Sequence, residues 1–241
     1  MIDPALAAAL ELAHQCATEP ITVTDLADEA GYSPFHFTRR FTLALGVPPG
    51  QFLTALRIDA AKRLLLAEPD PVIDVATAVG FDSLSSFSRR FRNTVGVPPA
   101  GFRRLADRVA DRPPRPFSLL PGGVPKLRVH LDVVPADRPS GELSLWVGWY
   151  PQPAPIGLPA QGMLVADTDM VELPLCPGNP WLLGFAVPLS AQVQDQLVPQ
   201  DPLVAVHPAE IVDLRQVTLS FRRPGARGIP LLSALPSLCR H

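Results

Sequence analysis

The sequence predicts a chain of two parts, an all-α part of about seven helices followed by a mainly-β part, an antiparallel sandwich or jelly-roll-like barrel. Three observations support this prediction. A motif in residues 37–52 returns 50 residues later in residues 87–102, which indicates a helical unit built twice. Prolines and glycines then interrupt the chain between residues 111 and 125. Beyond them, apolar and polar residues alternate in short runs, which is typical of strands.

The repeated motif has identical residues at nine aligned positions, and the preceding Ser33 and Ser83 make a tenth, too many for chance similarity of composition. Both copies contain Phe, a small hydroxyl residue between Phe and Arg, two arginines and a second Phe, followed by Gly-Val-Pro-Pro and a last Phe. Projected on a helix, each copy has one apolar face. The expected core-facing residues are Phe37, Phe41, Ala44 and Leu45 in the first copy and Phe87, Phe91, Thr94 and Val95 in the second.

The residues before each copy predict a further helix and a turn. In the first copy, residues 22–25 form a capping box that opens a short helix, and Gly31 stops it. Ser33 then caps the motif helix, with Pro34 at its first position. The corresponding signals of the second copy are Asp70, Pro71, Gly80 and either Asp82 or Ser83. A helix, a turn of a few residues with Gly and a second helix make a helix-turn-helix unit.

Paired amphipathic helices with Phe stripes can also be no more than an all-α core, and a single copy leaves that alternative open. Two copies, each with an outward Arg and a Gly-Val-Pro-Pro stop, favour DNA binding. Residues 31–104 carry ten Arg or Lys against five Asp or Glu, whereas residues 1–30 carry six acids and no Arg or Lys. The positive charge therefore lies where phosphate contact requires it. The net charge of −2 argues against a non-specific DNA-coating protein.

The order of residues in the second copy carries a family resemblance. The residues that carry it are Ile73, Ala76, Gly80, Phe81, Phe87, Arg89, Phe91, Gly96, Pro99, Phe102 and Arg103. Their spacing resembles the signature of the AraC/XylS transcription regulators, and the match covers about residues 5–108. The resemblance implies two helix-turn-helix units bridged by a long helix, whose recognition helices enter successive major-groove segments about 34 Å apart. It also implies RNA polymerase as a partner if the protein is an activator.

Arg39 and Arg89 are the residues expected to read bases, because an outward Arg can reach guanine O6 and N7 with both arms of its fork. The resemblance agrees, and a phosphate contact or an ion pair on the helix surface is the alternative. Arg40 and Arg90 flank the core stripe, which predicts phosphate contacts or intramolecular ion pairs. Phe35 lies opposite the stripe. It is expected either to press on thymine methyl groups or to pack against the first helix or the turn. The expected DNA-binding residues are Phe35, His36, Thr38, Arg39, Arg40, Thr42, Ser85, Ser86, Arg89, Arg90 and Arg92.

Three further helices complete the α part. One begins at residues 3–4, one bridges the two units over about residues 50–67, and one closes the part at about residues 98–110. Their expected inward residues are Leu6, Ala9, Leu10, Ala13, Phe52, Leu53, Leu56, Ala60, Leu64, Phe102 and Leu105. The bridging helix also carries three basic residues that are expected to be solvated or near phosphate, namely Arg57, Lys62 and Arg63.

The proline-rich residues 111–125 predict a semi-rigid linker between a DNA-binding domain at 1–110 and a β domain at 126–241. The expected strands are 127–133, 143–149, 162–166, 170–175, 181–187, 203–206 and 217–221, with one short helix at 191–197. Short strands with proline-rich turns favour the sandwich or jelly-roll-like barrel. Some relatives carry a mixed α/β small-molecule domain, a minor alternative because helical periodicity is scarce here.

The β domain is expected to sense a small-molecule effector, to form homodimers, or both. Aromatic residues are concentrated in two of its strands and can line a pocket, so Trp146, Trp149, Tyr150 and Trp181 are the expected effector-binding residues. They can equally fill the core of a sandwich. A β domain that only oligomerises is a third interpretation.

The β domain contains no catalytic constellation and no metal-ligand spacing, so neither an enzyme nor a cofactor nor a metal is expected. A DNA-targeted enzyme or repair protein is the alternative. An alkylated-DNA repair protein joins this module to a methyl-accepting cysteine in Pro-Cys-His-Arg, a stretch that Cys176 lacks. The three cysteines, an odd number, argue against a disulfide framework. Without a signal-peptide pattern or a membrane-spanning run, a cytoplasmic protein is expected.

Overall fold

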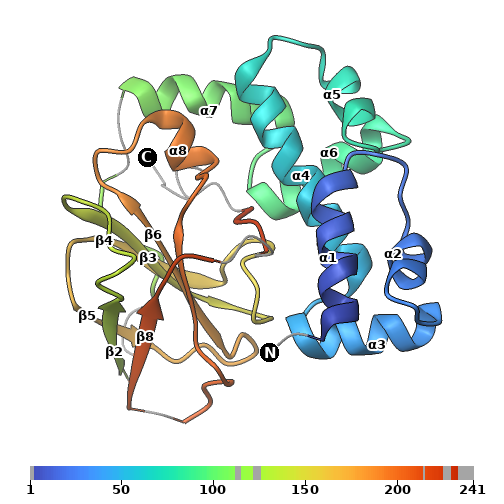
Figure 1. Ribbon diagram of the computed structural model, residues 1–241. Coiled ribbons are helices and arrows are strands. Elements are labelled where there is room, and N and C mark those ends of the chain that lie inside the picture. Colours follow the sequence, from blue (N-terminus) through green and yellow to red (C-terminus); the bar gives the residue numbers. More distant parts are fainter. Residues whose placement is uncertain (1–2, 112–114, 122–125, 214, 225–228, 233–241) are drawn as a thin grey trace.

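The computed structural model describes residues 3–111, 115–121, 126–213, 215–224 and 229–232. The α part comes first and confirms the expected seven helices, two of which form each helix-turn-helix unit (Figure 1). The helices are α1 (Pro4–Cys16), α2 (Val23–Glu29), α3 (Pro34–Leu45), α4 (Pro49–Ala67), α5 (Val72–Ala78), α6 (Leu84–Val95) and α7 (Pro99–Asp111). No helix within these ranges is long and apolar enough to cross a bilayer.

Side-chain caps start the helices where the sequence predicts. Thr22 Oγ1 accepts a hydrogen bond from the Asp25 N–H, and the Asp25 carboxylate accepts one from the Thr22 N–H at 2.7 Å, so the capping box is complete. Ser33 caps α3 and Ser83 caps α6 with their hydroxyl oxygens. Both helices end at a glycine in the left-handed conformation, which residues with a Cβ adopt only at a cost.

The two units repeat the same aromatic contact. Phe41 of α3 meets Phe52 of α4 with ring centroids 5.4 Å apart, and Phe91 of α6 meets Phe102 of α7 at 5.6 Å. Both pairs are edge-to-face, which is the favoured geometry for aromatic rings. One expected core residue differs: Ala44 is exposed, because the last turn of α3 directs it into a groove beside the β part.

The basic residues of α4 were expected to be solvated or near phosphate, but in the structure each has a partner within the protein. Arg57 is half-buried and donates to main-chain carbonyls in residues 17–21, which connect α1 to α2. Lys62 is completely buried against the end of the β part. Arg63 pairs with Asp59 one turn earlier, at 2.8 Å. The prediction is wrong for Lys62, because an amphipathic pattern does not show which face a second domain covers.

The described residues of the β part form two sheets and one short helix. Its elements are β1 (Phe117–Ser118), β2 (Lys126–Val133), β3 (Leu143–Tyr150), β4 (Gln161–Ala166), β5 (Met170–Pro174), β6 (Trp181–Pro188), α8 (Val193–Leu197), β7 (Leu203–Val206) and β8 (Gln216–Phe221). The order β1-β4-β3-β6-β7 forms an antiparallel sheet, and β5-β2-β8 forms the smaller one. The β2–β8 pair is parallel, unlike the expected antiparallel pattern. The strand β1 lies in the segment expected to be a linker.

Apolar side chains of both sheets meet in one core, to which β2 contributes Leu127 and β3 contributes Leu145. The opposite face of the larger sheet carries a second, smaller cluster around Trp146 and Phe185. Leu231, near the end of the described chain, covers this cluster. The larger sheet is therefore covered on both faces, which explains why almost every residue of β3 is buried.

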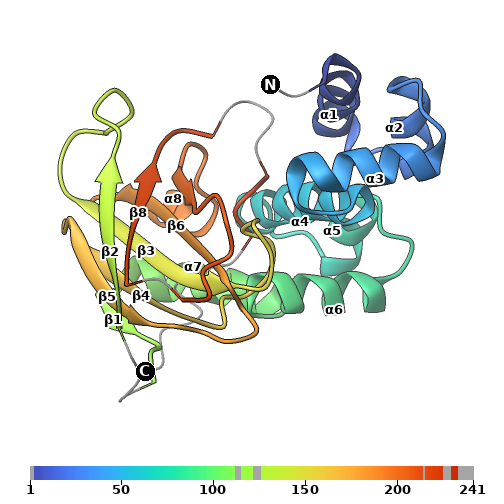
Figure 2. The ribbon, with the colours of Figure 1, turned by 90° about the horizontal axis from the view of Figure 1, so that it is seen from below.

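The core of the α part continues into the β part. Three segments of the β part are buried in the same cluster as the helical phenylalanines. They are the loop after β3 (Ala154 and Ile156), the end of α8 (Leu197 and Val198) and the end of the described chain (Leu232). Helix α7 reaches across to α8 at this interface (Figures 1 and 2). The two parts thus share an apolar core in addition to being joined along the chain.

Candidate nucleic-acid interface

The outer face of α3 carries the residues expected to contact DNA. Phe35 is 82% exposed, and Arg39 is also exposed on this face. Thr38 and Thr42 are half-buried, and the Thr42 hydroxyl donates to the Thr38 carbonyl at 2.7 Å. His36 is exposed beside Tyr32, outside this line of residues. Because the Thr42 hydroxyl is engaged within the helix, Phe35 and Arg39 are the most prominent side chains of the face.

Arg40 is exposed on α3, but its guanidinium is engaged by residues of the α part itself. Its guanidinium pairs with the Asp3 carboxylate at 3.1 Å and lies over the Tyr32 ring, 5.2 Å from the centroid. The Tyr32 hydroxyl donates to the same carboxylate at 2.8 Å. The hydrogen bonds from Tyr32 and from the Ala5 N–H, with the charge of Arg40, hold the pKa of Asp3 below its usual value. Two roles were predicted for Arg40, a phosphate contact and an intramolecular ion pair, and the structure shows the ion pair.

Helix α6 presents the corresponding face of the second unit. Arg89 has the same position in α6 as Arg39 has in α3, and it is exposed. Arg90 and Arg92 are exposed as well, while Ser85 is exposed and Ser86 half-buried. Among the described residues, no ion pair engages any of these three arginines, so their guanidinium groups are directed to solvent.

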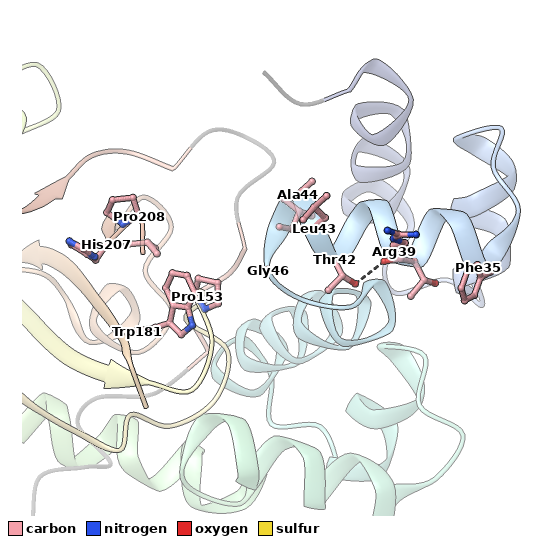
Figure 3. A pocket seen from close by; sticks show the side chains of 13 residues that line it. Phe35, Arg39, Thr42, Leu43, Ala44, Gly46, Pro153, Trp181, His207 and Pro208 are labelled. Carbon is pink, nitrogen blue, oxygen red and sulfur yellow. Dashed lines mark hydrogen bonds between the residues drawn. The ribbon is translucent and has the colours of Figure 1, made fainter. Parts of the chain in front are cut away.

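A groove of about 950 Å³ separates the outer face of α3 from the β part (Figure 3). Helix α3 forms one wall, and the loop after β3, the start of β6 and the end of β7 form the other. The lining residues are Phe35, Thr38, Arg39, Thr42, Leu43, Ala44, Leu45, Gly46, Pro153, Trp181, Val206, His207 and Pro208. Most of this lining is apolar, and among these described residues Arg39 is the one whose side chain is always charged.

The aromatic residues expected to bind an effector do not lie together in one pocket. Trp146, Trp149 and Tyr150 are completely buried, and the Trp149 indole donates to the Pro174 carbonyl at 2.9 Å. These three are core residues, which was the alternative to effector binding in the sequence analysis. Trp181 alone is half-buried and lines the groove beside α3.

Several groove residues were not singled out by the sequence. On the helix, Leu43 is 87% exposed, and it could have been noticed as an apolar residue outside the core stripe. The opposite wall, formed by Pro153 and residues 206–208, gives no local signal. These residues approach α3 only through the tertiary structure.

Cys176, the cysteine considered for a repair function, is buried. The Asn179 side-chain amide lies 3.8 Å from its sulfur. Burial raises the pKa of the Cys176 thiol, with a smaller opposing effect from Asn179. A raised pKa disfavours the thiolate, the reactive form, so the described surroundings do not activate this cysteine.

Residues 26–105 match a protein family described as a helix-turn-helix domain. Over 104 residues the chain is 35% identical to an AraC-like transcription regulator from Streptomyces lividans, covering 43% of this chain and 34% of that protein. Over 86 residues it is 34% identical to the HTH-type transcriptional activator AarP of Providencia stuartii, covering 36% of this chain and 64% of that protein. The chain therefore spans less than two thirds of either relative.

Among solved structures, the chain is similar to the DNA-binding domain of AdpA, a global transcriptional factor crystallised with a target DNA. The identity is 35% and the TM-score 0.42, and the alignment covers 47% of this chain and 100% of that one.

Proposed function

We propose that this chain, which belongs to the AraC/XylS family through its amino-terminal helix-turn-helix domain, is a sequence-specific transcription regulator that places α3 and α6 in successive major-groove segments of DNA. The relatives named above are regulators, and their similarity to this chain lies in the helical part. The function of the whole chain is therefore inferred from its own residues together with this domain.

The observation that supports the proposal most directly is the equivalence of α3 and α6. Each begins at a serine cap, buries two phenylalanines completely and exposes an Arg at the same position, Arg39 or Arg89. A core alone would require the buried phenylalanines but not the paired outward arginines. We assign Arg39 and Arg89 to base readout, since a guanidinium fork matches the two acceptors of guanine in the major groove.

The other residues of the two faces have supporting roles in this proposal. Arg90 and Arg92 contact phosphates, and Phe35 presses on a thymine methyl group. Arg40 joins the middle of α3 to the start of α1 through Asp3 and contacts DNA less directly. Thr38, Thr42, Ser85, Ser86 and His36 are secondary contacts, because hydroxyl groups discriminate weakly between bases.

We assign modulation to the β domain, through a small molecule, through homodimerisation, or both. Trp181 is the predicted effector residue that reaches the surface beside α3. If the chain activates transcription, as the name of AarP says of that protein, RNA polymerase is a further partner.

Selection of bound sequences from a random duplex pool with the purified full chain tests the proposal. We expect an enriched site with two short motifs about one helical turn apart. On that site Arg39→Ala and Arg89→Ala lose about 1–3 kcal/mol of binding free energy, with little change on random DNA. The matched control is Arg63→Ala, because Arg63 is paired with Asp59 on α4. Equal losses on both DNAs would make either Arg a phosphate contact, and no enrichment by any form would contradict the function.

A further inference from the structure

We propose that the β part and DNA compete for the outer face of α3, so that the first recognition helix enters DNA only after the β part moves away. This inference rests on the proposed function, because it assumes that this face reads DNA. It assigns a second, intramolecular partner to the same surface.

The end of α3 is in direct contact with the β part. Gly46, which ends α3, lies so close to Pro153 in the loop after β3 that a Cβ on Gly46 would overlap the proline ring. In Figure 3, Leu43 and Ala44 on α3 face His207 and Pro208 across the groove, and Phe35 lies at its far end. The β part therefore stands beside the carboxyl-terminal half of the recognition helix.

This position is difficult to reconcile with full insertion of α3 into DNA. A helix in the major groove, about 12 Å wide, has a phosphate ridge along each of its sides. Beside α3, the available space is a groove of about 950 Å³ with the β part as its other wall. A phosphate ridge along this side of α3 would need the space that Trp181 and residues 206–208 border.

The charge of the opposing wall also argues against a contact with DNA. The described residues of this wall, Pro153, Trp181, Val206, His207 and Pro208, include no Lys or Arg. A surface that binds DNA needs such cations to neutralise the phosphates. This edge is therefore suited to excluding DNA from α3 rather than to extending the DNA-binding surface.

The docked arrangement is supported by the shared core. Leu232 of the β part is completely buried in the same cluster as the helical phenylalanines, and Ile156 is nearly so. When only a fraction of the molecules is open, the apparent affinity for DNA falls to that fraction of its value for the open form. Any change that weakens the docking should therefore strengthen DNA binding by the full chain.

A reversible cross-link between α3 and the β part tests the inference directly. A Cβ at Gly46 would lie 3.6 Å from the Cβ of Pro153, within the range of about 3.5–4.5 Å that disulfides use. The variant is Gly46→Cys with Pro153→Cys, in a chain whose three native cysteines are replaced by serine. The two single variants, treated with the same oxidant, are the controls.

We expect the oxidised double variant to bind the selected site at least tenfold more weakly than the same protein after reduction. The single variants should not respond to the oxidant. Equal affinity of the oxidised and reduced forms, with the cross-link verified by mass, would overturn the inference.

A second pair of variants tests the opposite direction and does not depend on the cross-link. Leu232→Ala removes a side chain from the shared core, whereas Leu173→Ala removes an equally buried one from the core between the sheets. Severalfold tighter DNA binding by Leu232→Ala alone is expected, and unchanged affinity of that variant would count against the inference. If neither these variants nor the wild type bind any selected site, the proposed function fails as well.

Discussion

Lys62 in α4 donates a hydrogen bond from its Nζ to the main-chain carbonyl oxygen of Leu231 at 2.9 Å, and no part of the Lys62 side chain reaches solvent. The two residues are 169 positions apart in the chain. The bond joins the bridging helix of the DNA-binding domain to the end of the described β part. A charged ammonium without water is unfavourable, and burial lowers the pKa of Lys62 to about 8, with Asp59 opposing and Arg63 adding to the effect.

This burial predicts a pH dependence of stability. The folded pKa of Lys62 lies below its unfolded value of 10.5, so the unfolded chain binds more protons between about pH 8 and pH 10.5. The burial penalty is therefore complete below pH 8 and disappears as the pH rises through this window. It amounts to about 3 kcal/mol, at about 1.4 kcal/mol per pKa unit.

Urea unfolding of the wild type and of Lys62→Met, measured from pH 7 to pH 10.5, checks this prediction. We expect the wild type to gain about 3 kcal/mol relative to Lys62→Met across the window, because other groups titrate equally in both proteins. At pH 7 the variant should be similar to or more stable than the wild type, since the relieved charge offsets the lost hydrogen bond. Parallel curves would mean that Lys62 is hydrated.

Arg40 and Arg90 occupy equivalent positions in the repeat but are predicted to differ in role. Arg40→Ala removes the ion pair with Asp3 and should lower the melting temperature. Arg90→Ala should leave the melting temperature unchanged and weaken binding to specific and random DNA alike, because a phosphate contact carries no sequence information. Calorimetry combined with binding at two salt concentrations separates the two effects, and a reversed pattern would exchange the two assignments.

Arg57 is predicted to stabilise the connection between α1 and α2. Its guanidinium donates to the carbonyls of Ala17, Glu19 and Ile21 at 2.7–3.0 Å. Arg57→Ala should cost about 1–3 kcal/mol of unfolding free energy. Arg57→Lys should recover little of it, because an ammonium cannot reproduce the planar fork. The control is Arg63→Ala on the same helix, whose pair with Asp59 should contribute about 0.3–0.5 kcal/mol.

Any side chain at Gly162 in β4 is predicted to lower the stability of the β part, because Trp146 in β3 fills the space beside it. A Cβ at Gly162 would lie 2.6 Å from the Val147 carbonyl oxygen and 2.8 Å from the edge of the Trp146 ring. Gly162→Ala should therefore destabilise the β part by about 1–3 kcal/mol and change its near-UV circular dichroism. At Gly50, where the nearest atom would be 3.6 Å away, alanine should be neutral or stabilising by up to about 1 kcal/mol. Similar values for both variants would contradict the prediction.

The sequence predicted most elements of the fold because their signals are local. The caps at Thr22, Ser33 and Ser83 act on residues at most three positions away, and the helices begin where these caps predict. Strand alternation likewise predicted β2 to β8 to within one residue at nearly every boundary. The two residues of β1 are too few to show a period, so this strand was missed.

The faces of the β strands were harder to predict than their positions. In β3, Trp146 and Trp149 lie on opposite faces of the sheet, yet both are completely buried. When a sheet is covered on both faces, the sequence does not distinguish its buried aromatic residues from aromatic residues that line a pocket. The parallel pairing of β2 with β8 was also unpredictable, since it joins residues such as Val129 and Val217 from opposite ends of the domain.

By itself, the sequence determined the two helix-turn-helix units, the outward positions of Arg39 and Arg89, and the change to strands after residue 126. These features depend on the helical and strand periods and on caps, which involve neighbouring residues. The tertiary structure alone decided that Lys62 is buried and that the β part stands beside α3. Both depend on contacts between distant segments, whose free energy comes from apolar surface that the chain buries only when both parts are folded together.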